Sequence, residues 1–561
     1  MKLKHTMTSQ KLRGGYYTPQ IISDFLTQWA LENKGTTILE PSCGDGVFLE
    51  SVFKLGNPTR IKEILAIEYE SLEAKKVEKM IKDHPSFRDS CNVITGDFFE
   101  YYNKHLKNKK FDVVLGNPPY IRYQFFEEKQ RDEALKIMGV AGIKSNKLAN
   151  IWAAFLIAGI MSLKNHGRLG MVIPGEMLHV NYSNDVRQYM SKFPGKITII
   201  TFQELVFPDV QQEILLVMIE KNDMMEHSLQ NQLYNASINM VQLKNIDSLK
   251  NYDFSDLSPS KYKKVEPTNE KWTRYLLSKE ELNELKKIST HPKIKRLGNL
   301  ACVDVGTVTG ANKYFVVAED VIKEYELDSI SLPLVGRSTH IDGVIFGKAD
   351  WMKNKRKGVA SHLLKFPDES LAKYTKKMKK YVELGEKNGI QNGYKTGIRD
   401  RWYQVPSIWS PDAFLLRRSH KFPKLILNVA KAHTTDTMHR VKLREGTDPS
   451  SLIFCFYNSI TMAYSELVGR NHGGGVLEIL PNDAEEILIP YQKCEKKHLT
   501  KIDEMMRDNV DVEKILDYVD KVILLDNLGL SKNTVDTFRS IWRKLSNRRH
   551  ARKIKVKTIS S

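Results

Sequence analysis

Cysteine motifs, long apolar runs and a secretory leader are all lacking in this sequence. The cysteines are scattered without a Cys-x-x-Cys pair, which argues against a disulfide scaffold or a cysteine zinc site and fits the cytosol. The longest apolar run, residues 151–163, has 13 residues and is too short to span a bilayer. The first residues, Met1–His5, lead into polar sequence instead of an apolar signal core. We therefore expect a cytoplasmic protein with no bound metal and no membrane partner.

Acidic residues are fewer than basic ones. Asp plus Glu number 67 and Lys plus Arg number 86, so the net charge is +19. An excess of this size favours a polyanionic partner, either nucleic acid or an anionic membrane, and the shortness of the apolar runs counts against the membrane. The chain has 561 residues, of which 41% are apolar and 27% charged, which excludes a wholly disordered chain. Its length exceeds one ordinary core, so we expect two or more domains.

Short apolar runs separated by helix-like stretches fill the first 220 residues. Seven of them predict strands, at residues 37–39, 64–67, 92–94, 112–115, 169–173, 197–200 and 214–217. Strands that alternate with helices indicate an α/β fold, with a mostly parallel, doubly wound sheet and helices on both faces. The first domain is therefore predicted to be a large open sheet.

The sequence turns polar between residues 221 and 271, and the alternation of strands and helices does not continue beyond it. We place the first domain at residues 1–255 and a second, mixed α+β domain at residues 256–540. The remaining residues, 541–561, are rich in Lys and Arg and form a basic tail. This tail is either an arm that holds nucleic acid or a disordered end.

The first predicted strand runs into a loop of small residues that contains Gly44 and Gly46, and a helix follows. Glycines there let a ligand lie against the backbone, at the edge where doubly wound sheets bind nucleotides. Glu68 ends the second strand, and its carboxylate can accept hydrogen bonds from both hydroxyls of a ribose. Asp97 follows the third strand and can accept a hydrogen bond from the exocyclic amine of an adenine, with Phe98 against the face of the adenine ring. The Gly-Lys-Ser/Thr ending of a phosphate-binding loop is missing. The pattern favours an adenosyl ligand without phosphates, namely S-adenosylmethionine.

The fourth predicted strand ends in Asn117-Pro118-Pro119-Tyr120. The exocyclic amine of adenine is a poor nucleophile, and the Asn117 side-chain oxygen and the Pro118 carbonyl can hold its hydrogens and aim its lone pair. Two successive prolines keep these acceptors preorganised. Tyr120 offers a ring on which an extruded base can stack. In-line displacement at a sulfonium methyl then depends mainly on positioning.

The order of these segments resembles the gamma-class (TaqI-like), adenine-specific amino-methyltransferases of DNA. Gly14–Pro19 comes first, the Glu40–Gly46 loop follows, and Asn117–Tyr120 comes third. The resemblance implies a Rossmann-like methyltransferase domain, with Tyr17 and Thr18 beside the methionine end of the cofactor. Locally, Thr18 can also cap a helix that starts at Pro19.

The resemblance implies further roles for residues later in the chain. It places Phe155 near the cofactor adenine and makes Phe207 a second ring that stacks on the flipped base. Segments 304–315, 399–403 and 469–475 are similar to parts of the family's target-recognition domain, and Arg can also read guanine edges. The basic run of the tail has no counterpart in the family pattern.

The candidate residues form three sets. The expected catalytic residues are Asn117, Pro118 and Tyr120, with Phe207 as the partner in stacking. The expected cofactor-binding residues are Tyr17, Thr18, Glu40, Ser42, Gly44, Gly46, Glu68, Asp97, Phe98, Asn117, Pro119 and Phe155. The expected DNA-binding residues are Arg399, Arg401, Trp402, Arg417, Arg418, Arg470 and His472.

The sequence thus predicts a site-specific DNA methyltransferase that methylates the N6 amine of a flipped adenine in duplex DNA. By family analogy it serves a restriction-modification system, as a monomer, beside a separate cognate endonuclease. Three alternatives stay open: N4-cytosine methylation, methylation of RNA or protein glutamine, and sequence-specific DNA binding without chemistry. Asn117 counts against the first, because that group usually carries Ser there.

Overall fold

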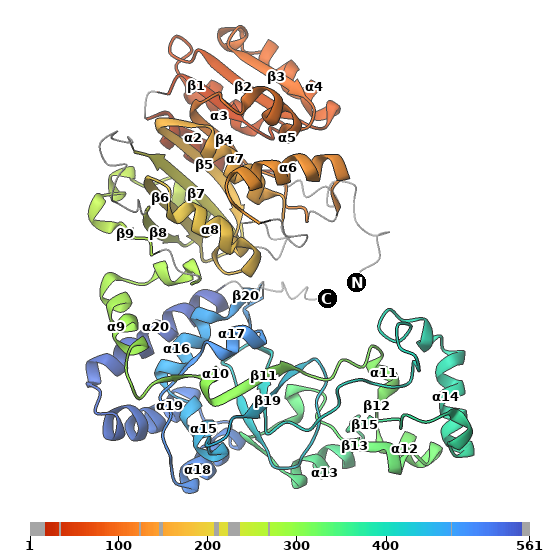
Figure 1. The fold of residues 1–561 in the computed structure, drawn as a ribbon. Coiled ribbons are helices and arrows are strands. Elements are labelled where there is room, and N and C mark those ends of the chain that lie inside the picture. The colour runs from red at the N-terminus through yellow and green to blue at the C-terminus, as the bar shows by residue number, and fades with distance from the viewer. Residues whose placement is uncertain are drawn as a thin grey trace, which may run out of the picture. The chain divides into compact units, whose positions relative to one another are not determined.

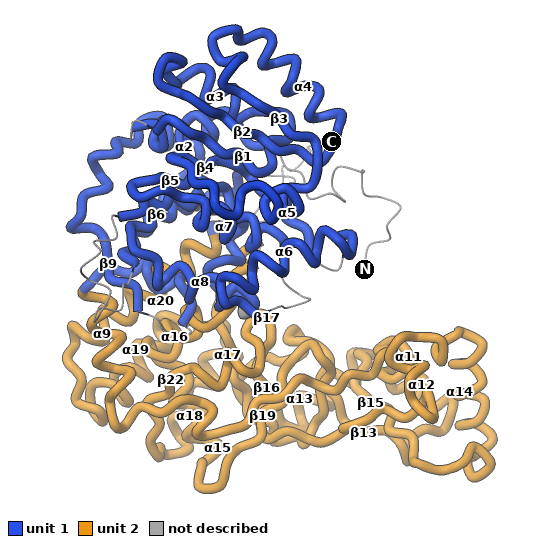
Figure 2. Tube along the Cα trace, turned by 45° about the horizontal axis from the view of Figure 1, so that its top comes forward, with its two compact units in different colours: residues 1–279, 551–561 blue, residues 280–550 orange. Residues whose placement is uncertain are grey.

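The computed structural model divides the chain into two compact units (Figure 2). Met1–Lys279 and Ala551–Ser561 belong to the first and Glu280–His550 to the second. The described residues are 17–32, 35–122, 125–144, 150–206, 213–222, 236–266, 270–472 and 474–551. Among them, no helix is both long and apolar enough to cross a membrane.

The first unit is built on a nine-stranded sheet with the order β3-β2-β1-β4-β5-β7-β6-β8-β9 (Figure 1). β7 runs antiparallel between β5 and β6, whereas the pairs among β1 to β5 are parallel. The strands are β1 (Thr37–Glu40), β2 (Glu63–Glu68), β3 (Cys91–Thr95), β4 (Phe111–Gly116), β5 (Leu163–Pro174), β6 (Gly195–Phe202), β7 (Ile214–Lys221), β8 (Ser237–Leu243) and β9 (Lys263–Lys264). All seven predicted strands form, and the predicted α/β fold class is confirmed.

Helices cover both faces of this sheet, because successive strand residues point to opposite sides. Val113 and Leu115 of β4 pack in one core cluster with α2 and α3, whereas Val114 faces Gly159 of α7 on the other side. Most of the apolar run at 151–163 forms a buried helix, α7, and Leu163 begins β5. The helices are α2 (Gln20–Leu31), α3 (Val47–Leu55), α4 (Ser71–Lys82), α5 (Phe98–Tyr101), α6 (Glu128–Val140), α7 (Trp152–Met161) and α8 (Asn184–Ser191).

The division between the units falls at Lys279, later than the expected boundary at residue 255. The polar segment contributes β8, which pairs in parallel with β6, and β9, which pairs with β8. Tyr262 shares a 2.7 Å hydrogen bond with Thr198 of β6. These contacts keep the segment after residue 255 on the first unit.

The second unit is mixed α+β, as expected. Its largest sheet has five strands in the order β11-β19-β16-β18-β14, and smaller sheets are β12-β15-β13, β17-β21-β20 and β10-β22. The strands are β10 (Lys295–Arg296), β11 (Ala301–Val305), β12 (Val316–Val317), β13 (Ser331–Pro333), β14 (Ile345–Phe346), β15 (His362–Leu364), β16 (Ala413–Leu416), β17 (Arg418–Ser419), β18 (Leu425–Asn428), β19 (Met438–Leu443), β20 (Arg470–His472), β21 (Val476–Glu478) and β22 (Leu488–Ile489). The longer helices are α9 (Lys279–Ser289), α13 (Lys348–Arg356), α14 (Lys376–Lys387), α15 (Pro449–Phe456), α16 (Ser459–Val468), α18 (Lys496–Arg507), α19 (Val512–Val519) and α20 (Lys532–His550).

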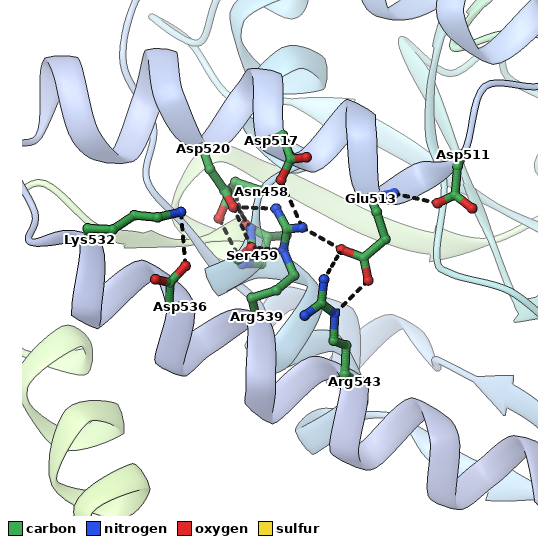
Figure 3. A network of polar contacts seen from close by, with 11 residues as sticks. Asn458, Ser459, Asp511, Glu513, Asp517, Asp520, Lys532, Asp536, Arg539 and Arg543 are labelled. Atoms are coloured by element: carbon green, nitrogen blue, oxygen red, sulfur yellow. Dashed lines mark hydrogen bonds and ion pairs between the residues drawn. The ribbon is translucent and has the colours of Figure 1, made fainter.

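The structure corrects the expectation that a basic tail begins at residue 541. Helix α20 continues to His550, and Trp542 and Leu545 are buried. Figure 3 shows Arg539 and Arg543 of this helix directed at acidic side chains: Arg539 pairs with Asp520 at 2.8 Å, and Arg543 with Glu513 at 2.7 Å. These guanidinium groups serve internal packing. Residues 552–561 lie outside the described residues.

Arg549 of α20 is fully buried and forms an equally buried ion pair with Glu466 of α16, with 2.7 Å between nitrogen and oxygen. Its guanidinium also donates to the backbone carbonyls of His420, at 2.6 Å, and Gly475, at 2.5 Å. A buried charge needs partners of this kind, and their loss is strongly destabilising. The C-terminal helix is therefore part of the core of the second unit.

Candidate functional site

A cavity of about 620 Å³ opens where β1, β2, β3 and β4 end. Strand order changes direction between β1 and β4, which is where open α/β sheets bind ligands. The lining includes every expected cofactor-binding residue except Gly46, namely Tyr17, Thr18, Glu40, Ser42, Gly44, Glu68, Asp97, Phe98, Asn117, Pro119 and Phe155. The structure thus brings together residues that lie far apart in the sequence.

The two loop glycines are required for different reasons. Gly44 has a φ of +54° and Gly46 a φ of +90°, a region that favours glycine. A Cβ on Gly44 would meet no atom of the described residues within 4 Å, whereas one on Gly46 would lie 3.1 Å from both Met80 and Val77 of α4. Gly46 therefore serves the turn into α3 and the packing on α4, and it does not face the cavity as expected.

Glu68 and Asp97 are held by backbone N–H groups. Glu68 accepts from Gly44 at 2.8 Å and from Glu70 at 2.9 Å, one with each oxygen. Asp97 accepts from Glu100 at 2.8 Å and caps α5. A carboxylate oxygen has two lone pairs, so both groups keep acceptor capacity for a ligand. Burial raises the pKa of both carboxyls despite these hydrogen bonds.

Glu40, at the end of β1, is buried at the base of the cavity. Neither of its oxygens, nor the Ser42 hydroxyl, has a hydrogen-bond partner among the described residues. Burial raises the pKa of Glu40 well above its usual range, and the charges of Glu68 and Asp45 raise it further. Among the described residues, the lining contains six other Asp or Glu side chains and no Lys, Arg or His. A cationic ligand fits this lining, whereas a phosphate does not.

Aromatic rings form the wall between β3 and α7. Phe98 and Phe155 stack with their centroids 5.1 Å apart. Tyr69, which is 51% exposed, also lines the cavity, together with Phe125 and Phe126. The sequence reasoning missed these three residues. Tyr69 directly follows Glu68, so its place at the end of β2 was the available signal.

The Asn117–Tyr120 segment follows β4 at the edge of the same cavity. The Asn117 amide nitrogen donates to the Thr18 hydroxyl at 3.0 Å, so the first motif and the tetrapeptide meet. The Tyr120 hydroxyl donates to Asn117 Oδ1 at 2.8 Å and lies 3.1 Å from the Val172 carbonyl oxygen of β5. Thr18 does not cap a helix as expected, because α2 begins at Gln20 with Pro19 before it. Phe207 lies outside the described residues.

Three of the expected DNA-binding residues surround one loop of the second unit. Arg399 donates to the backbone carbonyl of Thr309 at 2.8 Å and to that of Trp402 at 3.3 Å. Trp402 packs in an aromatic cluster, and Arg401 pairs with Asp368. Arg399 and Trp402 therefore support the loop from within.

The other expected DNA-binding residues gather at the β17-β21-β20 sheet. Glu478 lies at their centre, with 3.0 Å to each arginine and 2.8 Å to the histidine; these neighbours are Arg417, Arg418 and His472. Burial would raise the pKa of Glu478, but the hydrogen bond to His472 and the charges of Arg418 and Arg417 outweigh burial and lower the pKa. Arg470 pairs with Asp483 at 3.2 Å. The cluster keeps an excess of positive charge after Glu478 is counted.

Comparison with known proteins gives matches over both units. Residues 3–295 match the family model of N-6 DNA Methylase, and residues 269–524 match that of the C-terminal domain of the type II methyltransferase M.Eco57I. The type II methyltransferase M.AccI of Acinetobacter calcoaceticus is 24% identical over 545 residues, which cover 91% of this chain and 92% of that protein. M.HindII of Haemophilus influenzae is 25% identical over 347 residues, covering 59% and 60%.

Among solved structures, the type IIL restriction-modification enzyme MmeI in complex with DNA has a TM-score of 0.56 and 12% identity, covering 94% of this chain and 75% of that one. That likeness concerns the fold alone. The N-6 DNA Methylase model spans more than half of the chain, which confirms the family predicted from the motifs. The chain belongs to the N-6 DNA methylase family and is an adenine-specific DNA methyltransferase.

Proposed function

We propose that the cavity binds S-adenosylmethionine and that Asn117–Tyr120 presents an adenine of duplex DNA to it. The observation that carries this proposal is the 3.0 Å hydrogen bond from Asn117 to Thr18, because it joins the tetrapeptide to a wall of the cavity. The partnerless oxygens of Glu40 and Ser42 support a ligand with donors and positive charge.

Different residues of the cavity bind different parts of S-adenosylmethionine in this proposal. Glu68 accepts the ribose hydroxyls, Asp97 accepts from the adenine amine, and Phe98 and Phe155 cover the ring. Tyr17 and Thr18 lie at the methionine end. When bound, S-adenosylmethionine supplies a methyl group on a sulfonium centre, whose positive charge suits a lining rich in carboxylates.

The tetrapeptide acts on the target base. Asn117 Oδ1 and the Pro118 carbonyl accept the amine hydrogens, which aims the N6 lone pair at the methyl carbon. Because Pro118 and Pro119 restrict the loop, these acceptors need little reorganisation. Tyr120 stacks on the extruded base. The charged transition state is then stabilised mainly by groups that are already in place.

The second unit supplies the contacts to DNA in this proposal. Arg418 and His472 are its surface-exposed candidates, with Arg417 and Arg470 more enclosed beside them. In this proposal the enzyme acts as a monomer. It modifies the DNA site that a separate restriction endonuclease cuts. The relatives M.AccI and M.HindII are both named as type II methyltransferases. The family match does not favour cytosine, RNA or protein substrates, nor DNA binding without chemistry.

The test is single-molecule sequencing of DNA from cells that express the chain. We expect N6-methyladenine at one short motif, and its loss in Asn117→Ala, since one preorganised acceptor contributes about 100-fold or more in rate. Binding of a labelled duplex, measured by fluorescence anisotropy, should survive in Asn117→Ala, because the substitution removes an acceptor for the target amine and no contact to the rest of the DNA. Persistent methylation in Asn117→Ala would contradict the assigned role, as would a loss of DNA binding in step with the loss of activity.

A further inference from the structure

The loop after α14 exposes two large apolar side chains that nothing in the catalytic site uses. Tyr394 is 83% exposed and Ile398 is 72% exposed. Val308, on a neighbouring loop, is 40% exposed. Single exposed apolar residues are ordinary on protein surfaces, but several large ones gathered at one place mark an interaction site.

The same loop is held firmly from below. Thr396, between the two exposed residues, is fully buried, and its hydroxyl donates to the carbonyls of Ile390, at 2.5 Å, and Gly393, at 3.1 Å. The Gly397 N–H donates to the Gly393 carbonyl at 2.7 Å. The exposure of Tyr394 and Ile398 is therefore built into the loop, and little ordering is needed before a partner binds.

Arg399 joins this loop to the one that carries Val308. Its guanidinium donates to the carbonyl of Val308 at 3.3 Å and to that of Thr309 at 2.8 Å. Gly310, with a φ of +79°, lets the two backbones approach, since a Cβ there would lie 2.8 Å from the Lys395 Cβ. Val308 and the 394–398 segment thus belong to one surface.

Charge identifies the partner. Lys395 lies with its ammonium 5.4 Å from the centre of the Tyr394 ring, so a cation and an aromatic ring are presented side by side. Residues 373–401 contain nine Lys or Arg and three Asp or Glu. Protein interfaces are depleted in lysine, whereas nucleic-acid surfaces combine basic groups with rings and aliphatic wedges that pack on bases.

We propose that Tyr394 and Ile398 form an apolar edge that packs against the bases of bound duplex DNA, while Lys395 contacts phosphate. The inference rests on the proposed function only in taking duplex DNA as the partner. It assigns base contact to a segment distinct from Arg417, Arg418 and His472.

The test measures DNA affinity by fluorescence anisotropy, with the full chain and a short fluorescein-labelled duplex. The duplex carries the motif found by sequencing or, should none emerge, a mixed sequence. Tyr394→Ala should weaken binding about five- to 100-fold, as expected for a lost stacking partner, and Tyr394→Phe should restore it. Ile398→Ala should weaken binding in the same direction. The matched control is Val140→Ala, which truncates a residue that is 62% exposed on α6 of the first unit.

Salt dependence separates apolar contact from charge. Tyr394→Ala should leave the slope of log affinity against log salt unchanged, whereas Lys395→Gln should reduce that slope by about one. Melting temperatures should not change, because the altered side chains are exposed. Alanine variants that bind DNA like the wild type would overturn the proposal, as would altered self-association at unchanged DNA affinity. Absence of methylated adenine in the sequencing experiment would refute the proposed function, whereas the binding series, run on the mixed-sequence duplex, would still show whether Tyr394 and Ile398 contact DNA.

Discussion

Tyr120→Phe should increase extrusion of the target base. The Tyr120 hydroxyl donates to Asn117 Oδ1 at 2.8 Å, and this oxygen is the acceptor that the proposed mechanism offers to the adenine amine. An amide oxygen has two lone pairs, so the hydroxyl does not block this acceptor, but it uses part of the acceptor capacity that the adenine amine needs. Phenylalanine keeps the ring for stacking and removes the competing donor.

The structure sets the size of the effect. One hydrogen bond of this kind contributes about 0.5–1.5 kcal/mol net, so its removal should favour the extruded state by about two- to tenfold. Tyr120→Ala also loses the ring, which contributes about 1–3 kcal/mol of stacking, and should reduce extrusion by about five- to 100-fold. The two variants should therefore change extrusion in opposite directions.

The assay is the fluorescence of a duplex with 2-aminopurine at the target position, titrated with each variant at saturating protein. Fluorescence rises as the base leaves the stack, so it reports extrusion separately from methyl transfer. Single-turnover methylation on the unmodified duplex then shows whether the extruded base is still aligned. A loss of extrusion in Tyr120→Phe as large as in Tyr120→Ala would refute the competition, because the hydroxyl would then assist the base.

Two further variants test the cavity and the sheet beneath it. Glu68→Gln should weaken binding of S-adenosylmethionine by about tenfold or more in equilibrium dialysis. The glutamine amide nitrogen is a donor, so it would face the backbone N–H donor of either Gly44 or Glu70 and could not accept its hydrogen bond. Unchanged affinity would show that Glu68 does not bind the cofactor. Asp112→Asn should destabilise the first unit at neutral pH. Burial alone would raise the pKa of Asp112, but hydrogen bonds from Lys164 and two threonines lower it to about 2. Because the pKa of Asp112 is lower in the folded state than in the unfolded state, its charge stabilises the fold above the pKa of the unfolded state. This stabilisation is lost as pH falls through about 2. The difference between wild type and Asp112→Asn in the free energy of urea unfolding should therefore shrink by about 2 kcal/mol between pH of about 5 and about 2. A difference independent of pH would show that the Asp112 charge does not stabilise the fold.

Strand-end residues were the most predictable part of the site. Glu40, Glu68, Asp97 and Asn117 each follow a short apolar run, and β1 to β4 are neighbours in one parallel sheet. Carboxyl ends of parallel neighbours meet at one edge, so position along the sequence was enough to bring these groups together. Strand β8 was missed because Ser237–Leu243 mixes polar and apolar residues, the pattern of a strand near a sheet edge.

Contacts between distant segments were less predictable. The hydrogen bond between Thr18 and Asn117 joins residues 99 positions apart, and the partner of Arg549 is Glu466, 83 positions away. Local sequence patterns predict helix caps and the buried faces of strands, but they do not predict hydrogen bonds or ion pairs between residues so far apart in the sequence. For this reason the sequence predicts a basic tail at residues 541–561, although the acidic partners of Arg543 and Arg549 lie elsewhere in the second unit.

The sequence also does not show which basic residues are available to bind DNA. A count of Lys and Arg treats every cation as available, yet Arg399 serves backbone carbonyls, and Arg539 and Arg549 serve buried acids. A guanidinium whose donors are already engaged must break those bonds before it can bind phosphate, at a cost comparable to what it gains. Solvent-exposed cations such as Lys395 have no such cost. The 394–398 segment combines an exposed cation with an exposed ring, so DNA contacts there add to those proposed for Arg418 and His472 without breaking an existing ion pair.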